Sequence, residues 1–503
     1  MKSDKQPADD VFSYDELPYG GNTHASTHPR RIGAIARLFG IEPVDLQHAR
    51  VLEIGCGLGD DLLPLAAAYP EADFIGIDLG RRHVDVANGL ARERGLANVN
   101  FRQMDITAMD PNLGRFDYVI AHGVFSWVPP PVAQALLRIC ESLLTDRGLV
   151  YISYNTYPDW EQMGKVRDAM RAHVAGLPSP LAQVEATRRF VAKEVLAKRP
   201  DTSKNQSYDT AIRRVAARVE HASDSYVFHE FLCEHNHPIW FADFVANASD
   251  HGLRYVGDTD RTAMWGDGDG ATSNRIEREQ ALDRALGRGF RSSVLCKNPL
   301  EPTSEALPES LLNTCLSTQM LDRGEGQFGT SDAVQVTVTG TGIVKALRDI
   351  TKAQGRPIPF ASEWLQDNES QSVCDDLLNL IKVGLIDVGE PGGPGATQIE
   401  ERPVAFEIAR ALAAEGRDLV VGLGHRATTL DSIGQFILPR LDGTRDRNAL
   451  ARQVLAAMRR GELPALAPGT KKADAQKQVL TDIESWLERT LASELLVSSF
   501  KHN

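Results

Sequence analysis

The sequence predicts an α/β fold built around a parallel sheet, and three observations support that class. An apolar segment at residues 51–54 runs into a glycine-rich turn and then into a helix-like stretch. Further apolar segments follow, separated by helical patterns. Polar turn residues close several of these segments. Strands that alternate with helices favour a parallel sheet covered on both faces, which binds ligands at the carboxyl ends of its strands.

Seven strands are expected, and together they form one sheet. The first five are predicted at residues 51–54, 72–80, 98–105, 116–123 and 147–155, and the last two at residues 252–260 and 290–298. Amphipathic helices are predicted at residues 81–94 and 239–251.

The glycine turn is the most informative motif. Residues 51–59 read VLEIGCGLG, with Glu53 two positions before the first glycine. Glycine lets the backbone approach a ligand, and a helix start offers free N–H groups. The spacing G-x-G-x-G differs from the dinucleotide fingerprint G-x-G-x-x-G. It is the pattern of enzymes that bind S-adenosylmethionine (SAM).

Two carboxylates in register support this interpretation. Asp78 ends the second predicted strand, where a carboxylate can accept hydrogen bonds from both ribose hydroxyls. Asp105 ends the third strand, in position to accept from an adenine amino group. The alternative, that both are merely solvated turn residues, requires two coincidences. The predicted SAM site, with S-adenosylhomocysteine as product, comprises Glu53, Gly55, Cys56, Gly57, Gly59, Asp61, Asp78, Leu79, Asp105, Ile106 and His122.

Aromatic and polar residues near the ends of the fourth and fifth strands are candidates for binding the methyl acceptor. In-line displacement brings the nucleophile to within roughly 3 Å of the methyl carbon. A lysine acceptor must also lose its proton, which aromatic walls favour by excluding water. The predicted catalytic residues are Tyr154, Asn155, Tyr157, His122 and Trp127, and the predicted pocket walls are Tyr14, Tyr19, Phe125 and Trp160.

Structural alternatives stay open for several of these residues. Tyr157 and Pro158 can form a rigid turn, His122 can satisfy a strand end, and Trp127 can belong to the core. Near the N-terminus, Thr27 is expected as a helix N-cap followed by a proline at N1, or as part of a lid over the methionine end of SAM.

The predicted domain organisation has five parts. Residues 1–160 form an N-terminal arm and SAM-binding core, 161–238 a helical insertion acting as lid or substrate platform, and 239–298 the rest of the catalytic domain. Residues 299–330 are a linker by composition, and 331–503 a C-terminal interaction domain. Within the last part, residues 360–390 resemble a winged-helix module of two helices and a short strand.

Bulk properties exclude several classes of protein. A net charge of −13 argues against general nucleic-acid binding, which needs a basic field. No apolar run approaches the ~20 residues of a membrane span, and no signal peptide is visible, so a cytoplasmic enzyme is expected. Six cysteines without a C-x-x-C pair argue against a zinc ribbon or a disulfide framework. Cys233, His235 and His237 are interpreted as part of a polar hinge, and no metal site is predicted.

The chain resembles bacterial class I SAM-dependent methyltransferases with a methyltransferase regulatory domain, and within them the rickettsial protein lysine methyltransferases. The matching segments are SYDELPY (13–19), THPRRIGAIARLFG (27–40), RVLEIGCGLG (50–59), HGVFSWVP (122–129), SYNTYPDW (153–160), YVFHEFLCEHNHPIWFADF (226–244) and LDGTRDRNAL (441–450). The resemblance implies a Rossmann-like seven-stranded catalytic domain, an inserted helical domain and a C-terminal winged-helix-containing domain. Asp159 replaces the family's usual glycine, and Asp60–Asp61 its common Gly-Asn. A carboxylate at residue 61 suits the ammonium group of SAM but repels its carboxylate.

Three functions therefore remain as hypotheses. The first is protein lysine N-methylation, which the resemblance, the aromatic strand ends and the large extra domains favour. The second is methylation of a small molecule beneath a closed lid. The third is a SAM-binding regulatory protein with little catalysis, which the substitutions at Asp61 and Asp159 keep open.

Overall fold

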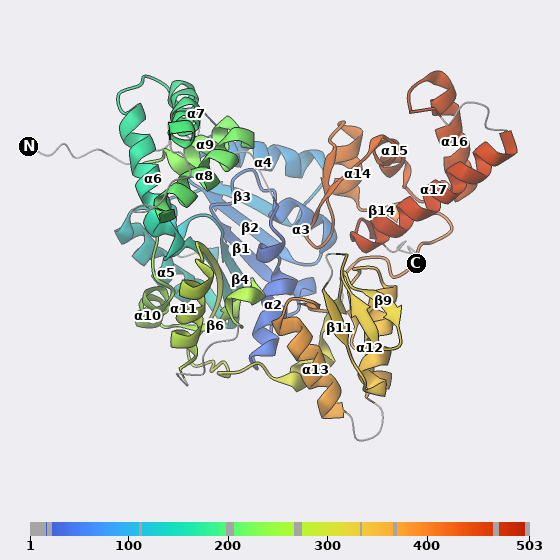
Figure 1. Ribbon diagram of the computed structural model, residues 1–503, viewed down its shortest axis with the longest axis horizontal. Coiled ribbons are helices and arrows are strands. Elements are labelled where there is room, and N and C mark those ends of the chain that lie inside the picture. Colours follow the sequence, from blue (N-terminus) through green and yellow to red (C-terminus); the bar gives the residue numbers. More distant parts are fainter. Residues whose placement is uncertain are drawn as a thin grey trace, which may run out of the picture. The chain divides into compact units, whose positions relative to one another are not determined.

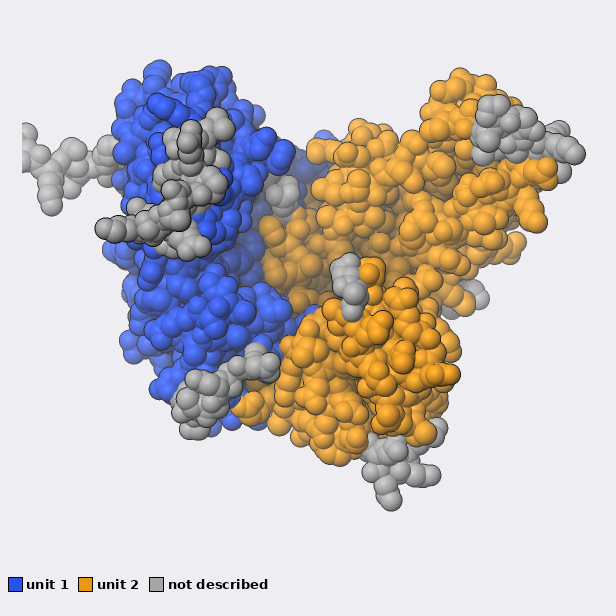
Figure 2. All heavy atoms as spheres, viewed as in Figure 1, with its two compact units in different colours: residues 1–22, 50–60, 74–304 blue, residues 23–49, 61–73, 305–503 orange. Residues whose placement is uncertain are grey.

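The computed structural model describes residue 17 and residues 23–109, 113–197, 206–265, 274–331, 334–365, 370–391, 393–465 and 472–497. These residues form two compact units, distinguished by colour in Figure 2. The described parts of residues 50–60 and 74–304 belong to the first unit. Residues 23–49 and 61–73 join the described parts of residues 305–503 in the second. The units do not coincide with the predicted domain boundaries, which stay a prediction.

A seven-stranded mixed sheet forms the centre of the first unit (Figure 1). Its strand order is β3-β2-β1-β4-β5-β7-β6. β7 runs antiparallel to both β5 and β6, while β2 and β3, β1 and β4, and β4 and β5 pair in parallel, so the predicted seven-stranded Rossmann-like sheet is confirmed with one antiparallel strand. The strands are β1 Arg50–Ile54, β2 Asp73–Asp78, β3 Val99–Gln103, β4 Phe116–Ala121, β5 Leu144–Asn155, β6 Leu253–Asp258 and β7 Phe290–Lys297.

Most strands of the sheet are buried on both faces because they are apolar, whereas the edge strand β3 alternates between buried and exposed residues. One face packs against the helices α5 (Pro130–Leu143) and α10 (Phe241–Asp250) in a continuous apolar core. At the other end of the sheet, α4 (Arg81–Glu93) packs along β3. The remaining helix of this region, α11 (Arg275–Leu286), begins at an Asn274 side-chain cap and ends at Gly287, where φ is 62°. These caps are of the type that favours helix termini.

Between β5 and α10 the chain forms a helical insertion with its own apolar core. Its helices are α6 Asp159–Val174, α7 Pro180–Ala197, α8 Gln206–His221 and α9 Asp224–Phe231. The Arg214 guanidinium donates to both oxygens of Asp159, at 2.7 and 2.8 Å, and so ties α8 to the start of α6. Asp159, the departure from the family pattern, therefore has a structural partner.

The second unit contains short strands and helices from both ends of the chain. From the N-terminal half come α2 (Pro29–Leu38) and α3 (Leu62–Ala68). The other strands are β8 Cys315–Ser317, β9 Leu321–Gly324, β10 Gln327–Gly329, β11 Gln335–Thr337, β12 Ile358–Pro359, β13 Asp387–Gly389, β14 Val404–Ala405, β15 Leu419–Val421, β16 Ala427–Thr429 and β17 Leu496–Val497. The other helices are α12 Thr341–Lys352, α13 Ser370–Lys382, α14 Glu407–Ala414, α15 Ser432–Ile437, α16 Arg447–Arg460 and α17 Lys472–Ala492.

Two features of this unit differ from the sequence-based predictions. The segment 299–330, predicted as a linker from its composition, contains the strands β8, β9 and β10. Average composition missed them because each is only three or four residues long. β8 pairs with the distant strands β12 and β13, whereas β10 pairs with its neighbours β9 and β11. In addition, α2 is joined to β13 by ion pairs, for example Arg31 to Asp387 at 3.2 Å. In the part of the chain that the structure describes, no helix has the length and apolar character needed to cross a membrane.

Candidate functional site

The glycine turn follows β1 and is held by backbone hydrogen bonds to β2. The Gly55 and Cys56 amides both donate to the Ile77 carbonyl, at 2.8 and 3.1 Å. Gly55, Gly57 and Gly59 have φ values of 76°, 51° and 80°, a region that glycine adopts without strain. A Cβ at Gly57 would meet no described atom within 4 Å. The main chain at this position is therefore open to a ligand that approaches it closely.

The other two glycines are required by packing within the protein. A Cβ at Gly55 would lie 2.6 Å from the Val124 side chain, and one at Gly59 would lie 2.6 Å from the Phe101 ring. Glu53 and Cys56 are both buried beside the turn, each 5% exposed. Burial raises the pKa of the Cys56 thiol well above its usual range, and nearby Glu53 adds to the effect. Cys56 therefore acts as a neutral, small packing residue.

Asp78 connects the glycine turn to the start of α4. Its Oδ2 accepts a hydrogen bond from the Gly57 amide at 2.9 Å, and its Oδ1 accepts one from the Gly80 amide at 2.8 Å. The His83 Nδ1 atom lies 3.3 Å from Oδ1. His83 is missing from the sequence prediction. A histidine in the first turn of the helix that follows Asp78 was the signal available.

Asp105 follows β3 and caps a short 3-10 helix, Ile106–Ala108. Its Oδ1 accepts from the Thr107 amide at 2.7 Å and from the Thr107 hydroxyl at 2.8 Å. The side chain is exposed, and so is Leu79, at 44%. Both residues lie at strand ends with accessible surface, as an adenine site requires, and their roles stay predictions.

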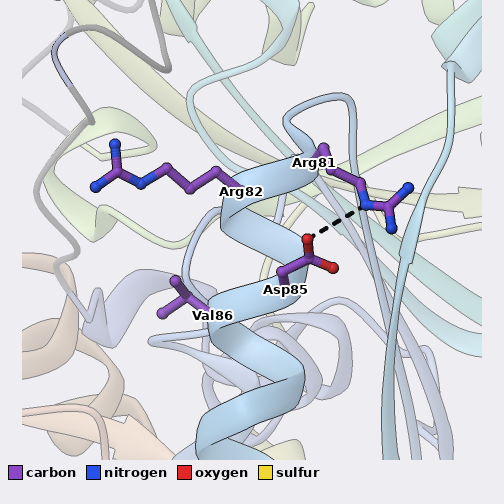
Figure 3. Close-up of a pocket in the computed structure, with 4 residues that line it drawn as sticks. All are labelled: Arg81, Arg82, Asp85 and Val86. Atoms are coloured by element: carbon purple, nitrogen blue, oxygen red, sulfur yellow. Dashed lines mark hydrogen bonds and ion pairs between the residues drawn. The ribbon is translucent and has the colours of Figure 1, made fainter.

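The residues at this edge fit the chemistry of SAM. Gly57 leaves room for close approach to the backbone, and Asp78 is a carboxylate at the end of the neighbouring strand. A shallow depression at the start of α4 is lined by Arg81, Arg82, Asp85 and Val86 (Figure 3). There Arg81 Nε donates to Asp85 at 3.2 Å. None of these four residues belongs to the predicted cofactor site.

His122 directly follows β4 and is oriented by an aromatic neighbour from β5. The Tyr151 hydroxyl lies 2.9 Å from His122 Nδ1, and the two rings stack with centroids 5.9 Å apart. Tyr151 in turn donates to the Ser292 hydroxyl at 3.2 Å. The His122 side chain is half-buried, as is Trp127 five residues later. Both remain candidates for the acceptor side of the site.

Three predicted acceptor residues lie in apolar cores instead. Tyr154 is 2% exposed, stacks on Phe244 at 4.0 Å, and shares the strand face of core residues Val150 and Ile152. Alternation along β5 therefore turns it away from Asn155. Phe125 is 4% exposed in the same core, and Trp160 is 6% exposed in the core of the insertion. The prediction that these three line a substrate pocket is not supported.

The end of β5 is clamped to the segment before α10. The Asn155 amide donates to the Ser126 hydroxyl at 2.9 Å, and the Ser126 carbonyl accepts from the His237 amide at 2.7 Å. The Asn155 side chain donates to the Asn236 side-chain oxygen at 3.1 Å. Asn236, from the Asn-x-Pro motif, was not predicted as a site residue. The clamp places both amide side chains at the carboxyl edge of the sheet.

Tyr157 is half-buried and packs on Trp240, with ring centroids 5.3 Å apart. This packing agrees with a rigid turn at Tyr157 and Pro158, and it agrees equally with a position of Tyr157 beside the acceptor site. The predicted pocket residues Tyr14 and Tyr19 lie outside the described residues.

In the second unit, Asp61 belongs to a buried group that we call the Asp61 cluster: His24, Thr27, His28, Asp61 and His425. Asp61 is 4% exposed. Its Oδ1 accepts from the His24 amide at 3.0 Å, and its Oδ2 accepts from the Thr27 hydroxyl at 2.7 Å. Both oxygens therefore have protein donors, which does not support the prediction of Asp61 as an ammonium ligand. Sequence reasoning missed the cluster, since His425 lies 364 positions from Asp61.

The start of α2 differs from the prediction by one residue. His28, not Thr27, is the N-cap: its side chain accepts from the Arg30 amide, and Pro29 occupies the N1 position. Because Nδ1 of His28 accepts, Nε2 carries the proton and donates to the Leu423 carbonyl at 3.0 Å. The Thr27 hydroxyl is used by Asp61 instead.

We expect the Asp61 cluster to make stability depend on pH. Burial lowers the pKa of His425 to about 4 and raises that of Asp61 to about 6. The stability contributed by neutral His425 is fully present above its unfolded pKa of about 6.5 and is lost as pH falls toward 4. Asp61 acts with the opposite sign, gaining stability as pH falls through 6. His24 and His28, which also face the cluster, have lowered pKa values because they are buried.

Comparison with the variant His425→Asn isolates the contribution of His425 to the pH dependence of stability. On going from pH 7 to pH 5, the free energy of unfolding of the parent should fall by about 2 kcal/mol relative to the variant. Urea unfolding at both pH values measures the difference. A parent and variant that respond equally to pH would contradict the expected burial effect.

Among the described residues, no group of three or more His, Cys, Asp or Glu side chains has a metal-binding arrangement. His235 and His237 lie 3.4 Å apart through ring nitrogens, and Cys233 contacts His229 at 3.5 Å. The hinge interpretation of this segment stays a prediction.

Three family models match the chain. The model described as a methyltransferase domain matches residues 45–214, and that of a predicted methyltransferase regulatory domain matches 223–297. The model described as a PKMT C-terminal winged helix domain matches 401–494. The winged helix thus lies later than residues 360–390, where helix and strand order alone placed it.

Relatives and solved structures agree with these models. The chain is 26% identical to protein RP789 of Rickettsia prowazekii over 96% of this chain and 93% of that protein. It is 33% identical to RP028 of the same organism over 47% of this chain and 94% of that protein. PKMT2 from Rickettsia typhi, solved in complex with AdoHcy, aligns with a TM-score of 0.82 and 24% identity over 96% of this chain and 100% of that one. A second structure of the same protein gives 0.82 and 25%, over 95% and 100%.

The fold and the matches define a SAM-dependent methyltransferase. The chain belongs to the bacterial class I methyltransferases that carry a methyltransferase regulatory domain and a C-terminal winged helix domain.

Proposed function

We propose that this enzyme methylates the side-chain amine of lysine residues in a protein. The observation that carries the proposal is the likeness to rickettsial PKMT2 along nearly the whole chain, including both regions beyond the catalytic sheet. A small-molecule acceptor would not need those regions. They provide surface on which a protein substrate can dock.

The proposed roles at the cofactor edge follow the geometry of the strand ends. Asp78 would accept from the ribose hydroxyls, and Asp105 would accept from the adenine amino group. When bound, SAM supplies an electrophilic methyl group on a sulfonium. Asp78 also holds the Gly57 amide, so the same carboxylate orders the turn on which the cofactor would lie.

The proposed acceptor site lies at the ends of β4 and β5. His122, held by Tyr151, and Trp127 are half-buried there, and Asn155 is fixed by Ser126 and Asn236. Aromatic walls exclude water, which favours the neutral amine that attack on the methyl carbon requires. The helical insertion would act as a lid or platform for the substrate. The six cysteines are free thiols, which agrees with the proposed cytoplasmic location.

The proposal is tested by transfer of radiolabelled methyl from SAM into a lysate that is then separated into protein and small-molecule fractions. We expect label in discrete protein bands, on lysine by mass spectrometry, and no label with Asp78→Ala. Label confined to small molecules would overturn lysine methylation and favour the second hypothesis. Label on a protein residue other than lysine would retain protein methylation and overturn the choice of acceptor.

A further inference from the structure

The first residue of β7 carries an aromatic side chain that is open to solvent. Phe290 is 43% exposed, whereas every other Phe, Tyr or Trp side chain that the structure describes is buried or half-buried. A single exposed apolar residue is common on protein surfaces, so the inference depends on where the ring lies and on what surrounds it.

The register of the sheet places Phe290 at the carboxyl edge of β5. β7 runs antiparallel to β5, and Phe290 lies directly opposite Asn155, the last residue of β5. Residues that are directly opposed on antiparallel strands extend to the same face of the sheet. The next pair, Tyr154 and Arg291, extends to the other face, where both side chains pack on aromatic rings of α10. Phe290 and Asn155 therefore share the face that is turned away from α10.

The Phe290 ring borders the polar side chains of the proposed acceptor site, all within the first unit. Its centroid lies 6.0 Å from that of His122, with the two ring planes inclined at 62°. His122 is held on Tyr151, and the Asn155 side chain is held by Asn236. An exposed apolar ring thus lies beside an imidazole and opposite a fixed carboxamide.

This combination suits a side chain with an apolar stem and a cationic head. Lysine packs its methylene groups along apolar surface while its charged end stays near polar groups. The face of an aromatic ring also attracts an ammonium group, methylated or not. An aliphatic residue at position 290 would provide only the first of these interactions. The aromatic residues that were predicted to line the pocket but lie in apolar cores provide neither: Phe125, Tyr154 and Trp160.

We propose that Phe290 is a specificity-determining residue, on whose ring the acceptor lysine side chain lies with its amine directed between His122 and Asn155. The inference rests on the proposed function and deepens it. It adds to the acceptor site a residue from β7, the antiparallel strand of the sheet. The local sequence FRSSVLCK gives no sign of this role, because only the pairing with β5 brings Phe290 to Asn155.

The test measures initial rates of radiolabelled methyl transfer into the protein fraction of a lysate, at saturating SAM and varied lysate concentration. Phe290→Ala should raise the half-saturating concentration of lysate protein roughly 10-fold, because it removes both the apolar surface and the ring face. Its Kd for SAM, measured by isothermal titration, should stay at the parental value. Phe290→Trp keeps a ring and should behave like the parent, whereas Phe290→Leu should fall between the parent and Phe290→Ala. Leu286→Ala, which removes a 59% exposed apolar side chain at the end of α11, is the matched control.

The outcomes separate this inference from the proposed function. Parental saturation in Phe290→Ala would overturn the inference, and so would an equal loss in Leu286→Ala. A lowered unfolding temperature or a raised Kd for SAM in Phe290→Ala, without rescue by Phe290→Trp, would assign Phe290 a structural role and overturn it too. Label from the parent on small molecules, or on a residue other than lysine, would overturn lysine methylation and this inference together. Label on lysine that is insensitive to residue 290 would overturn this inference alone.

Discussion

Asp78→Ala should abolish cofactor binding at ordinary SAM concentrations, with Kd rising 100-fold or more. The substitution removes the predicted acceptor of two ribose hydrogen bonds and releases the amides of Gly57 and Gly80. Hydrogen bonds to a charged group contribute about 1.5–3 kcal/mol each, so the loss of the ribose pair alone is worth at least about 3 kcal/mol. Isothermal titration with SAM measures the change directly.

Two further variants make the expectation specific. Asp78→Asn keeps one acceptor oxygen and should fall between the parent and the alanine variant. Asp85→Ala removes an exposed aspartate in the second turn of α4 and should bind SAM like the parent. A parental Kd in Asp78→Ala would show that the ribose is bound elsewhere and that Asp78 serves only to order the turn.

Arg291→Met should give the largest loss of stability in the first unit. Arg291 lies on β7 with no exposed surface, and its guanidinium donates to Glu279 at 2.9 Å and to Asp283 at 2.9 and 3.0 Å. Asp258 lies 3.7 Å away, and the Phe241 ring 3.8 Å away. Removing one member of a buried ion group costs about 3–5 kcal/mol, because its partners stay charged and buried.

After loss of Arg291, the two other arginines of the group do not supply enough positive charge for its carboxylates. Arg275 contacts Glu279 at 2.8 Å, and Arg288 contacts both Asp283 and Asp260 at 2.9 Å, so the intact group, Asp258 included, has four carboxylates and three guanidiniums. Burial already raises the pKa of Asp258 to about 6, and loss of Arg291 would raise it further. The variant should therefore lose less stability at pH 5 than at pH 8.

Urea unfolding, followed by a probe in the first unit, measures this loss. Arg284→Met, on the same helix as Glu279 and exposed, is the matched control and should change stability by less than about 1 kcal/mol. Equal stability of Arg291→Met and the parent would mean that the buried carboxylates are already neutral at the pH of the experiment.

Much of the fold could be predicted from local sequence. The seven strands and the helices α4 and α10 lie near their predicted positions, because apolar segments and turn residues specify them over short distances. The cofactor edge was predictable for the same reason. Gly57 and Asp78 are 21 residues apart. Gly57 lies in the turn after β1, and Asp78 is the last residue of β2, which lies beside β1 in the sheet. The carboxyl ends of such strands meet at one edge.

The acceptor side of the site was less predictable, because neighbouring side chains at the end of a strand point to opposite faces of the sheet. Asn155 and Tyr154 are neighbours, yet the first lies in the clamp with Asn236 and the second packs under α10. The face of β5 that packs against α10 depends on β7. This strand lies between β5 and β6 and pairs Arg291 with Tyr154.

The sequence by itself determined the class of enzyme, the succession of its strands along the chain and the residues at the ends of β1, β2 and β3, since spacing along the chain encodes them. Only the tertiary structure decided that Phe125, Tyr154 and Trp160 are core residues and that Asp61 is held by His24 and Thr27 near His425. Contacts between residues far apart in the chain follow no local period. They depend on which faces meet when the elements pack, and that is settled by the burial of the whole chain.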